Sequence, residues 1–460
     1  MRKKSGFIFI MIIILSFVLA ACGSSDDVDS EGNSSGDNEG TVLTVATVNN
    51  PDMKIMQKLT KEYFEEETGI SVEFVELPEN DLRKKVTEDV ALGDGAFDIV
   101  TISTYDTPIW AQNDWIETLS PQLDALSDEE KEAYDLEDIF PTMRDALTHE
   151  DDLYALPFYG ESTMLYYNKE IFEDVGLEMP LHPTWDEVGD MARTIKDETG
   201  TPGIVLRGLP GWGEMMAPVT TMINAFGGSY YDEDWNAQLD SENTLNAINF
   251  YVDLLEDAGQ PGATSTGFTE ALTVMSTGKA AMWYDATVAA GFLDNPDDSD
   301  VVGKIGYAFA PTQEKEENTG GLYAWSLAIE SASKNKDAAF EFIKWSTSKE
   351  YIELVGEEEG WVVVPSGTRI STYENEQYQE AAPFSDMVLE SILSVDYDNP
   401  AVYPVPYVGA RYVAIPEFQS LGTEVSQQIA AAISGDKSVA DAMKEAQKLA
   451  EEAVEDGGYK

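Results

Sequence analysis

The alternation of apolar runs and amphipathic segments after residue 41 most limits the folds open to this chain. Three apolar runs have the length and composition of buried strands: Val42–Val48, Ile70–Leu77 and Phe97–Ser103. The two segments between them, Asp52–Thr68 and the stretch through Leu82, Val86 and Val90, carry apolar residues at helical spacing. This βαβαβ order predicts a parallel sheet with helices on its faces.

The loop after the third predicted strand is a candidate for ligand contact. Ligands of parallel sheets collect beyond the carboxyl ends of the strands, and residues 104–108 follow that strand directly. Tyr105 and Asp106 in this loop are therefore candidate ligand contacts. Trp110 is interpreted as a packing residue.

A second set of strands and helices begins after residue 157. Thr184 and Glu187 form a predicted capping box that opens a helix. Further elements are predicted from the same patterns: strands at Ile204–Arg207, Ala280–Tyr284, Ile305–Ala308 and Trp325–Ile329, and helices from Glu214 and at Ser241–Ala258, Lys334–Ser348 and Val439–Val454.

The length predicts two lobes, because about 420 residues exceed what one core usually holds. The strand at Trp325–Ile329 is predicted to return to the first lobe. We expect an α/β fold in which each lobe is a sheet flanked by helices: residues 41–157 and 312–348 in lobe 1, and residues 158–311 and 349–460 in lobe 2.

The N-terminal segment has the pattern of an export signal that ends at a cysteine. A basic start, an apolar stretch and small residues precede Cys22, the only cysteine of the chain. This order resembles the lipobox of bacterial lipoproteins. We therefore predict a signal peptide over residues 1–21, lipid attachment at Cys22 and a disordered acidic tether over residues 22–40. The protein would sit on the outer face of the cytoplasmic membrane.

The formal net charge of −58 excludes a nucleic-acid surface, which needs a basic stripe. It also argues against polyanionic ligands. The acidic residues are scattered along the chain, and we interpret them as adaptation to a salty or alkaline exterior, where screening tolerates such repulsion.

The catalytic motifs that are missing narrow the function further. Only two histidines, His149 and His182, occur, and neither lies near a second metal ligand, so no metal site or cofactor is expected. Residues 160–164 fail the GxSxG pattern at the last glycine, and no GxxxxGK[ST] loop is present. The remaining candidates are carboxylates, an arginine and aromatic residues in the loops that follow strands. This set suits a neutral ligand rich in hydroxyls, with CH faces that pack on aromatic rings.

Six strings resemble the extracellular solute-binding lipoproteins of ABC importers, family 1, and within it the sorbitol/mannitol (polyol) branch. They are FDIVTISTYDTPIW (Phe97–Trp110), LYALPFYGESTMLYYNKEIF (Leu153–Phe172), RGLPGWGE (Arg207–Glu214), GKAAMWYDATVAAGF (Gly278–Phe292), YIELVGEEEGWVVVPSGTR (Tyr351–Arg369) and PVPYVGARYVAIPEFQ (Pro404–Gln419). The chain departs from this branch at Leu209, where relatives often carry a basic residue. The resemblance implies a type II periplasmic-binding-protein-like fold, joined by hinge crossovers, that closes on one solute and hands it to membrane permease subunits. It implies a monomer without catalytic activity.

Several candidate site residues follow from these strings, each with a plainer alternative. Glu161 lies in a crossover between the lobes. It is expected either to contact ligand or to be a solvated carboxylate of the hinge. Asp285 contacts ligand or caps the next helix. Arg207 contacts ligand or pairs with a surface acid. Trp212 lies in a glycine-flanked loop and is interpreted as a stacking platform. The resemblance adds Glu214, Trp361, Tyr407 and Arg411, whereas Trp283 and Trp325 are expected in the core.

Two other functions stay open at this point. A monosaccharide or short oligosaccharide would use the same class of protein as a polyol. A surface-anchored glycosidase would use Glu161 and Asp285 as an acid and base pair, with the carboxyls about 5–10 Å apart.

Overall fold

The computed structural model describes residues 40–460, which belong to one compact unit. The predicted signal peptide, Cys22 and the tether up to residue 39 lie outside the described residues. Within residues 40–460, no helix combines the length and the apolar character needed to cross a bilayer.

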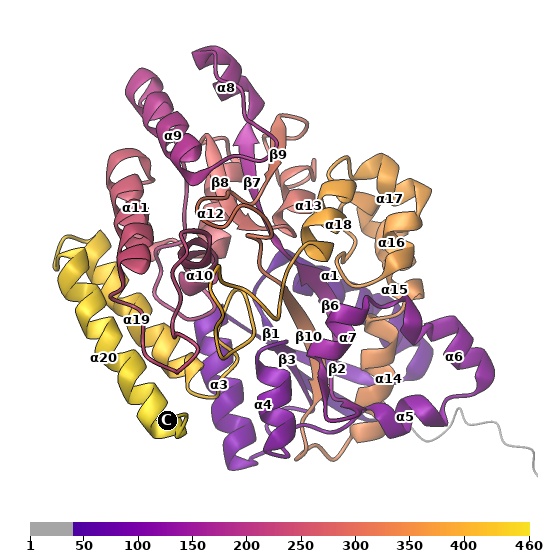
Figure 1. Cartoon of the computed structure of the whole chain (residues 1–460). Helices are drawn as coiled ribbons and strands as arrows, with labels where there is room; N and C mark the ends of the chain where they lie inside the picture. The colour runs from indigo at the N-terminus through magenta and orange to yellow at the C-terminus, as the bar shows by residue number, and fades with distance from the viewer. Residues whose placement is uncertain (1–39) are drawn as a thin grey trace, which may run out of the picture. The chain divides into compact units, whose positions relative to one another are not determined.

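A five-stranded sheet forms the core of the lower half of the molecule in Figure 1, in the order β2-β1-β3-β10-β6. Its strands are β1 (Val42–Val48), β2 (Ser71–Leu77), β3 (Ile99–Ser103), β10 (Tyr323–Ile329) and β6 (Leu156–Glu161). β1 pairs in parallel with β2 and β3, which confirms the predicted βαβαβ unit. β10 is antiparallel to both β3 and β6, so the chain returns to this sheet as predicted.

The register of β10 places the ends of several strands at one edge of this sheet. Trp325 pairs with Ser103, the last residue of β3, and Tyr323 pairs with Glu161, the last residue of β6. The start of β10 therefore lies beside the carboxyl ends of its two neighbours. This is the edge where ligands of such sheets collect.

A second sheet of three antiparallel strands has the order β8-β7-β9. Its strands are β7 (Thr163–Asn168), β8 (Met282–Ala286) and β9 (Ile305–Phe309). Only Ser162 separates β6 from β7, so the chain passes from one sheet to the other at a single residue. Residues 310–322 form a second connection between the sheets, from β9 back to β10. A separate hairpin joins β4 (Thr148–His149) and β5 (Asp152–Leu153).

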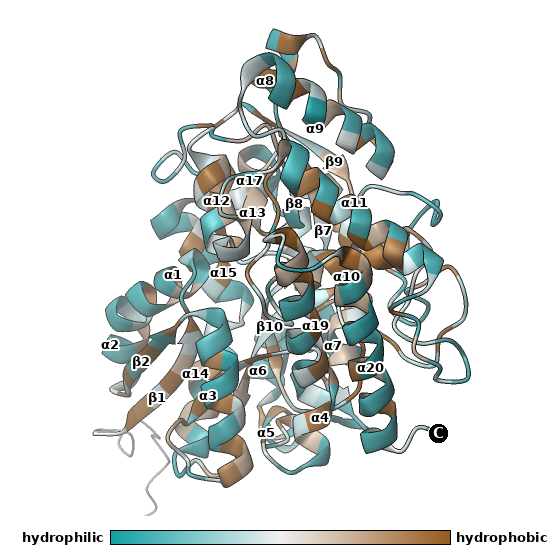
Figure 2. Cartoon of the chain, turned by 90° about the vertical axis from the view of Figure 1, so that its left-hand side faces the viewer, coloured by the Kyte–Doolittle hydropathy of each residue, from teal (hydrophilic) through white to brown (hydrophobic). Residues whose placement is uncertain are grey.

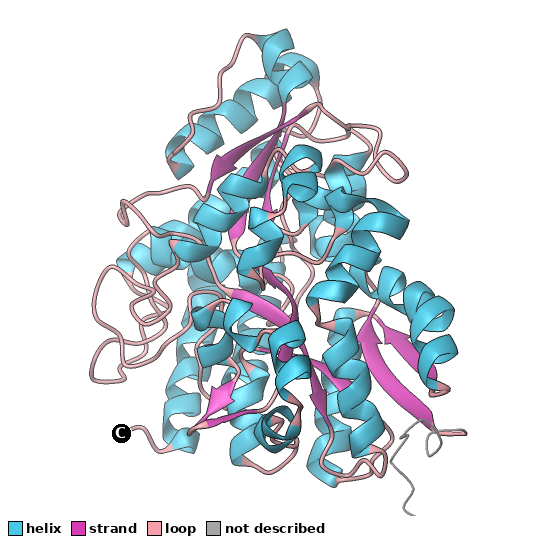
Figure 3. Cartoon of the chain, turned by 90° about the vertical axis from the view of Figure 1, so that its right-hand side faces the viewer, coloured by secondary structure: helices cyan, strands magenta, loops and turns pink. Residues whose placement is uncertain are grey.

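Helices enclose both sheets (Figure 3). The longer ones are α1 (Pro51–Leu59), α3 (Glu79–Leu92), α9 (Trp185–Thr199), α10 (Met216–Ala225), α11 (Glu242–Ala258), α12 (Phe268–Ser276), α14 (Lys336–Ser346), α18 (Ser385–Leu393), α19 (Phe418–Ile433) and α20 (Val439–Gly457). The shorter ones are α2 (Glu65–Thr68), α4 (Asp106–Gln112), α5 (Ser120–Ala125), α6 (Asp128–Tyr134), α7 (Pro141–Ala146), α8 (Lys169–Val175), α13 (Ala289–Leu293), α15 (Lys349–Val355), α16 (Ile370–Glu374) and α17 (Glu376–Ala381). α19 and α20 pack on each other and on α11. Their hydrophilic residues gather along one side, as expected for amphipathic helices (Figure 2).

The helix starts follow the local chemistry of the sequence. Thr184 accepts a hydrogen bond from the Glu187 amide at 3.2 Å, and the Glu187 carboxylate accepts one from the Thr184 amide at 2.8 Å. The predicted capping box of α9 is thus confirmed. The helix predicted over residues 52–68 is also present, as α1, a π-helical turn and α2 in succession, and Gly69 ends it with a φ of 72°.

The strand predicted at Ile204–Arg207 is wrong. Val205 makes one isolated bridge with Trp283, and no ladder continues from it within the described residues. The side-chain amide of Gln260 bonds to the backbone of Leu206 instead. The Gln260 oxygen accepts a hydrogen bond from the Leu206 N–H at 3.2 Å, and the Gln260 nitrogen donates one to the Leu206 carbonyl at 2.7 Å. A side-chain amide therefore replaces the strand partner, which a periodicity pattern cannot reveal. The helix predicted from Glu214 begins two residues later, at Met216.

Candidate functional site

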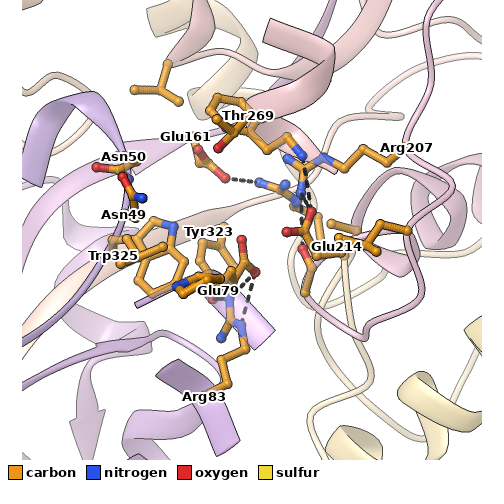
Figure 4. A pocket seen from close by; sticks show the side chains of 18 of the residues that line it. Asn49, Asn50, Glu79, Arg83, Glu161, Arg207, Glu214, Thr269, Tyr323 and Trp325 are labelled. Atoms are coloured by element: carbon orange, nitrogen blue, oxygen red, sulfur yellow. Dashed lines mark hydrogen bonds and ion pairs between the residues drawn. The ribbon is translucent and has the colours of Figure 1, made fainter. Parts of the chain in front are cut away.

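A cavity of about 220 Å³ lies at the sheet edge where β10 meets β3 and β6. Its lining comes from the ends of β1, β6 and β10, the start of α3, the loop before α10 and the start of α12. Figure 4 shows Asn49, Asn50 and Trp325 on one side of this cavity and Arg207 and Glu214 on the other. The volume is below the roughly 300–1,000 Å³ of clefts for drug-sized ligands, so it suits a small solute.

Three buried arginines line the cavity, and each is paired with a carboxylate. Arg83 donates to Glu79 at 2.9 Å, Arg411 donates to Glu161, and Arg207 lies 3.4 Å from Glu214. Since the protein already neutralises these guanidinium charges, the cavity offers hydrogen bonds without an excess positive charge. An anionic ligand is therefore disfavoured, whereas hydroxyl groups can bond to both partners of each pair.

Arg207 is the most firmly held of the three arginines. It donates from Nε to Asp285 at 2.8 Å and from Nη2 to the other carboxylate oxygen at 2.5 Å. Asp285 is fully buried and also accepts from Trp283 Nε1 at 3.0 Å. Asp285 thus lies behind Arg207 and outside the cavity lining, where it fixes the guanidinium plane.

Two tryptophans, Trp212 and Trp325, form apolar walls of the cavity. The Arg83 guanidinium lies 4.1 Å from the centroid of Trp212 and 4.6 Å from that of Trp325. Tyr105 packs on Trp212 from outside the cavity lining, with the ring centroids 4.7 Å apart. Both indoles are therefore held in place and offer faces on which CH groups can pack.

The loop that carries Trp212 is clamped between other elements. The Gly211 amide donates to Ser426 of α19, and Asn80 of α3 donates to the Pro210 carbonyl. A side chain at Gly213 would place its Cβ 2.4 Å from a Glu79 oxygen. A side chain at this position would therefore have to displace the Glu79–Arg83 pair. The loop is therefore packed against α3 and α19.

Three lining residues each have a buried polar atom without a hydrogen-bond partner among the described residues: Asp52 Oδ2, Trp212 Nε1 and Arg411 Nε. Buried polar atoms are almost always paired, because an unpaired one costs about 1–3 kcal/mol. Each of these three atoms is thus a hydrogen-bonding group of a lining residue that residues 40–460 leave unpaired.

Burial changes the acidity of the carboxyl groups in the cavity. Burial raises the pKa of Glu161, although Arg411 opposes the shift. Burial, with the nearby Glu79 charge, raises the pKa of Glu214 to about 8. Both shifts favour the uncharged carboxylic acid, because a buried charge is costly.

Five of the predicted site residues come together in this cavity: Glu161, Arg207, Trp212, Glu214 and Arg411. Three others lie just behind the lining. Tyr105 packs on Trp212, Asp106 lies 3.8 Å from Arg83, and Asp285 holds Arg207.

Two predicted residues are not brought to the cavity lining. Trp361 packs beside Gly356, and the Tyr407 hydroxyl accepts a hydrogen bond from the Tyr230 amide at 3.2 Å. Trp325, expected in the core, lines the cavity, whereas Trp283 is fully buried as expected.

Sequence reasoning missed the residues that follow the first two strands. Asn49, Asn50 and Asp52 come directly after β1, and Glu79 and Arg83 come after β2. The rule that singled out residues 104–108 after β3 applies equally to these two strands. Both loops would have been found by applying it to every parallel strand.

The fold and the cavity are those of a binding protein for small solutes. Residues 47–353 match the family of bacterial extracellular solute-binding proteins. A mannitol-binding protein of Pseudomonas aeruginosa is 43% identical to this chain over 418 residues, which are 91% of the chain and 94% of that protein. The chain belongs to the bacterial extracellular solute-binding protein family.

Solved structures agree with this assignment. The chain is similar to an ABC transporter solute-binding protein from Agrobacterium vitis with bound D-mannitol, at a TM-score of 0.88 and 47% identity over 91% of this chain and 99% of that one. It is also similar to a ribitol complex from Agrobacterium radiobacter, at a TM-score of 0.79 and 25% identity over 90% of this chain and 99% of that one. The predicted two-lobed α/β fold is confirmed. The prediction that the protein is a transport component and not an enzyme is also confirmed. This finding removes the glycosidase alternative.

Proposed function

We propose that this protein captures a linear polyol, such as mannitol or sorbitol, in the 220 Å³ cavity and delivers it to the permease of an ABC importer. The observation that carries the proposal is the set of three buried arginine–carboxylate pairs in one cavity that two tryptophans also line. A chain of vicinal hydroxyls can bond to several such pairs at once, while its CH groups pack on the indoles. The relatives with mannitol and ribitol in their names support this choice.

Thermal shift with a panel of ligands tests the choice of polyol. We expect D-mannitol, D-sorbitol or D-arabitol to raise the melting temperature most, because a ligand that binds only the folded protein stabilises it by mass action. D-glucose and maltose are the comparison ligands. A larger shift with either sugar would indicate that the natural ligand is a sugar and not a polyol. No shift with any polyol or sugar of the panel would argue against a binding protein for this class of solute.

We further propose that the mature protein is a monomer anchored by lipid at Cys22 to the outer face of the cytoplasmic membrane. The basic start, the apolar stretch and the single cysteine that follows small residues support this anchor. Mass spectrometry of the protein from its own membrane tests it. A diacylglyceryl group on Cys22 is expected, and a mature chain that lacks Cys22 would contradict it.

The charge of −58 supports a third proposal, adaptation to salt or alkali. Because the acidic groups repel one another and screening shortens this repulsion to about 3 Å at molar salt, we expect NaCl to raise the melting temperature steeply. Differential scanning calorimetry from low to molar NaCl measures the effect. A melting temperature that stays flat over this range would contradict the adaptation.

A further inference from the structure

Asp52 is a buried acid of the cavity, and no ion pair among residues 40–460 includes it. It lies in the first turn of α1, two residues after the N-cap Asn50, and its side chain is about 4% exposed. It lines the ligand cavity, and its Oδ2 has no hydrogen-bond partner among the described residues. A second, very small cavity of about 10 Å³ also borders it, beside Thr287 and Tyr378.

The ionisable groups that face Asp52 are acids and phenols. Glu161 and Tyr159 come from β6, and Tyr351 comes from α15. Arg411, which also lines the cavity, pairs with Glu161. Within residues 40–460, no lysine or arginine forms an ion pair with Asp52. A charged Asp52 would therefore be a buried anion beside a second anion, which is costly.

We propose that Asp52 holds the ligand as a carboxylic acid, donating a hydrogen bond to a ligand hydroxyl oxygen, so that polyol binding is linked to one proton. This role rests on the proposed polyol function. The cavity is rich in acceptors, with carboxyl oxygens of Glu79, Glu161, Glu214 and Glu270 in its lining. A neutral acid adds a donor where the arginines are already engaged, and a polyol hydroxyl can accept from it while donating to a neighbouring carboxylate.

The acidity of Asp52 agrees with this geometry. Burial, with the Glu161 charge as the second cause, raises its pKa to about 8. Asp52 therefore keeps its proton at neutral pH and loses it in alkaline solution. If only the protonated form binds, affinity is constant below this pKa and falls about tenfold per pH unit above it.

Calorimetric titration of the full mature protein with D-mannitol between pH 6 and pH 9.5 tests the role. For the wild type we expect a constant affinity up to about pH 8, a decline beyond it, and net proton uptake there in buffers of different ionisation enthalpy. Asp52→Ala should weaken binding at least tenfold at pH 6. Asp52→Asn keeps an N–H donor, so it should weaken binding less than Asp52→Ala and should abolish the alkaline decline.

Glu214 is the necessary control, since its pKa is also about 8. Glu214→Gln should keep the alkaline decline, because its carboxylate is engaged by the Phe268 amide at 3.1 Å and by Arg207. A wild-type affinity that is constant to pH 9.5, or an Asp52→Asn variant that retains the decline, overturns the role of Asp52 and leaves the polyol function standing. Failure of every polyol to bind at pH 6 contradicts the proposed function and this role together.

Discussion

Replacing Trp212 by alanine is expected to weaken D-mannitol binding at least tenfold, or about 1.4 kcal/mol or more. Trp212 lines the cavity, and its Nε1 is a buried donor without a partner among the described residues. Alanine removes both this donor and the apolar face, which the Arg83 guanidinium backs at 4.1 Å. Calorimetric titration well below the unfolding temperature measures the loss.

A matched variant separates this effect from general destabilisation. Trp345 lies outside the cavity lining and packs with Phe64 and Phe342. Trp345→Ala should therefore lower the melting temperature but leave the dissociation constant for D-mannitol unchanged. Equal affinities of Trp212→Ala and the wild type would remove Trp212 from the site.

Replacing Asp285 by alanine is expected to lower the free energy of unfolding by about 3–5 kcal/mol, the usual cost of breaking a buried ion pair. The variant would remove the shorter of two acidic contacts of the buried Arg207 and leave the contact with Glu214 at 3.4 Å. It would also remove the acceptor for Trp283 Nε1. Urea denaturation followed by tryptophan fluorescence measures the change.

An exposed ion pair provides the control for this prediction. Arg193 and Asp257 lie 2.9 Å apart, and their side chains are 35% and 53% exposed. Asp257→Ala should cost less than about 1 kcal/mol, because water competes for such charges. If Asp285→Ala were as stable as Asp257→Ala, Asp285 would not be holding Arg207 in the way that the geometry indicates.

Local patterns were sufficient for most of the fold. The apolar run at Val42–Val48 is β1, and the capping box at Thr184 opens α9, because both depend on neighbours in the sequence. The failure at Ile204–Arg207 has a different cause: Gln260, more than fifty residues away, bonds to the backbone that a strand partner would otherwise satisfy. No periodicity within the segment carries that information.

The site was predictable to the extent that it follows strand ends and family strings. Glu161, Arg207 and Arg411 were found in this way, but their pairing was not, since Arg411 reaches Glu161 across 250 positions of the chain. Asp285 was expected to contact ligand or to cap the next helix; the structure places it against Arg207, and Val288 is the N-cap of α13. Trp325 lies on an apolar strand, so the sequence predicts a core residue. The register of β10 against β3 brings it to the cavity as well.

The most direct test of the central claim compares D-mannitol with its charged analogue D-mannonate in one calorimetric titration series. The carboxylates of the protein neutralise the arginines of the cavity, so an uncharged ligand is favoured. We therefore expect saturable binding of D-mannitol and at least a hundredfold weaker binding of D-mannonate, a difference of about 2.7 kcal/mol. D-mannonate that binds as tightly as D-mannitol, or D-mannitol that does not bind, would contradict it.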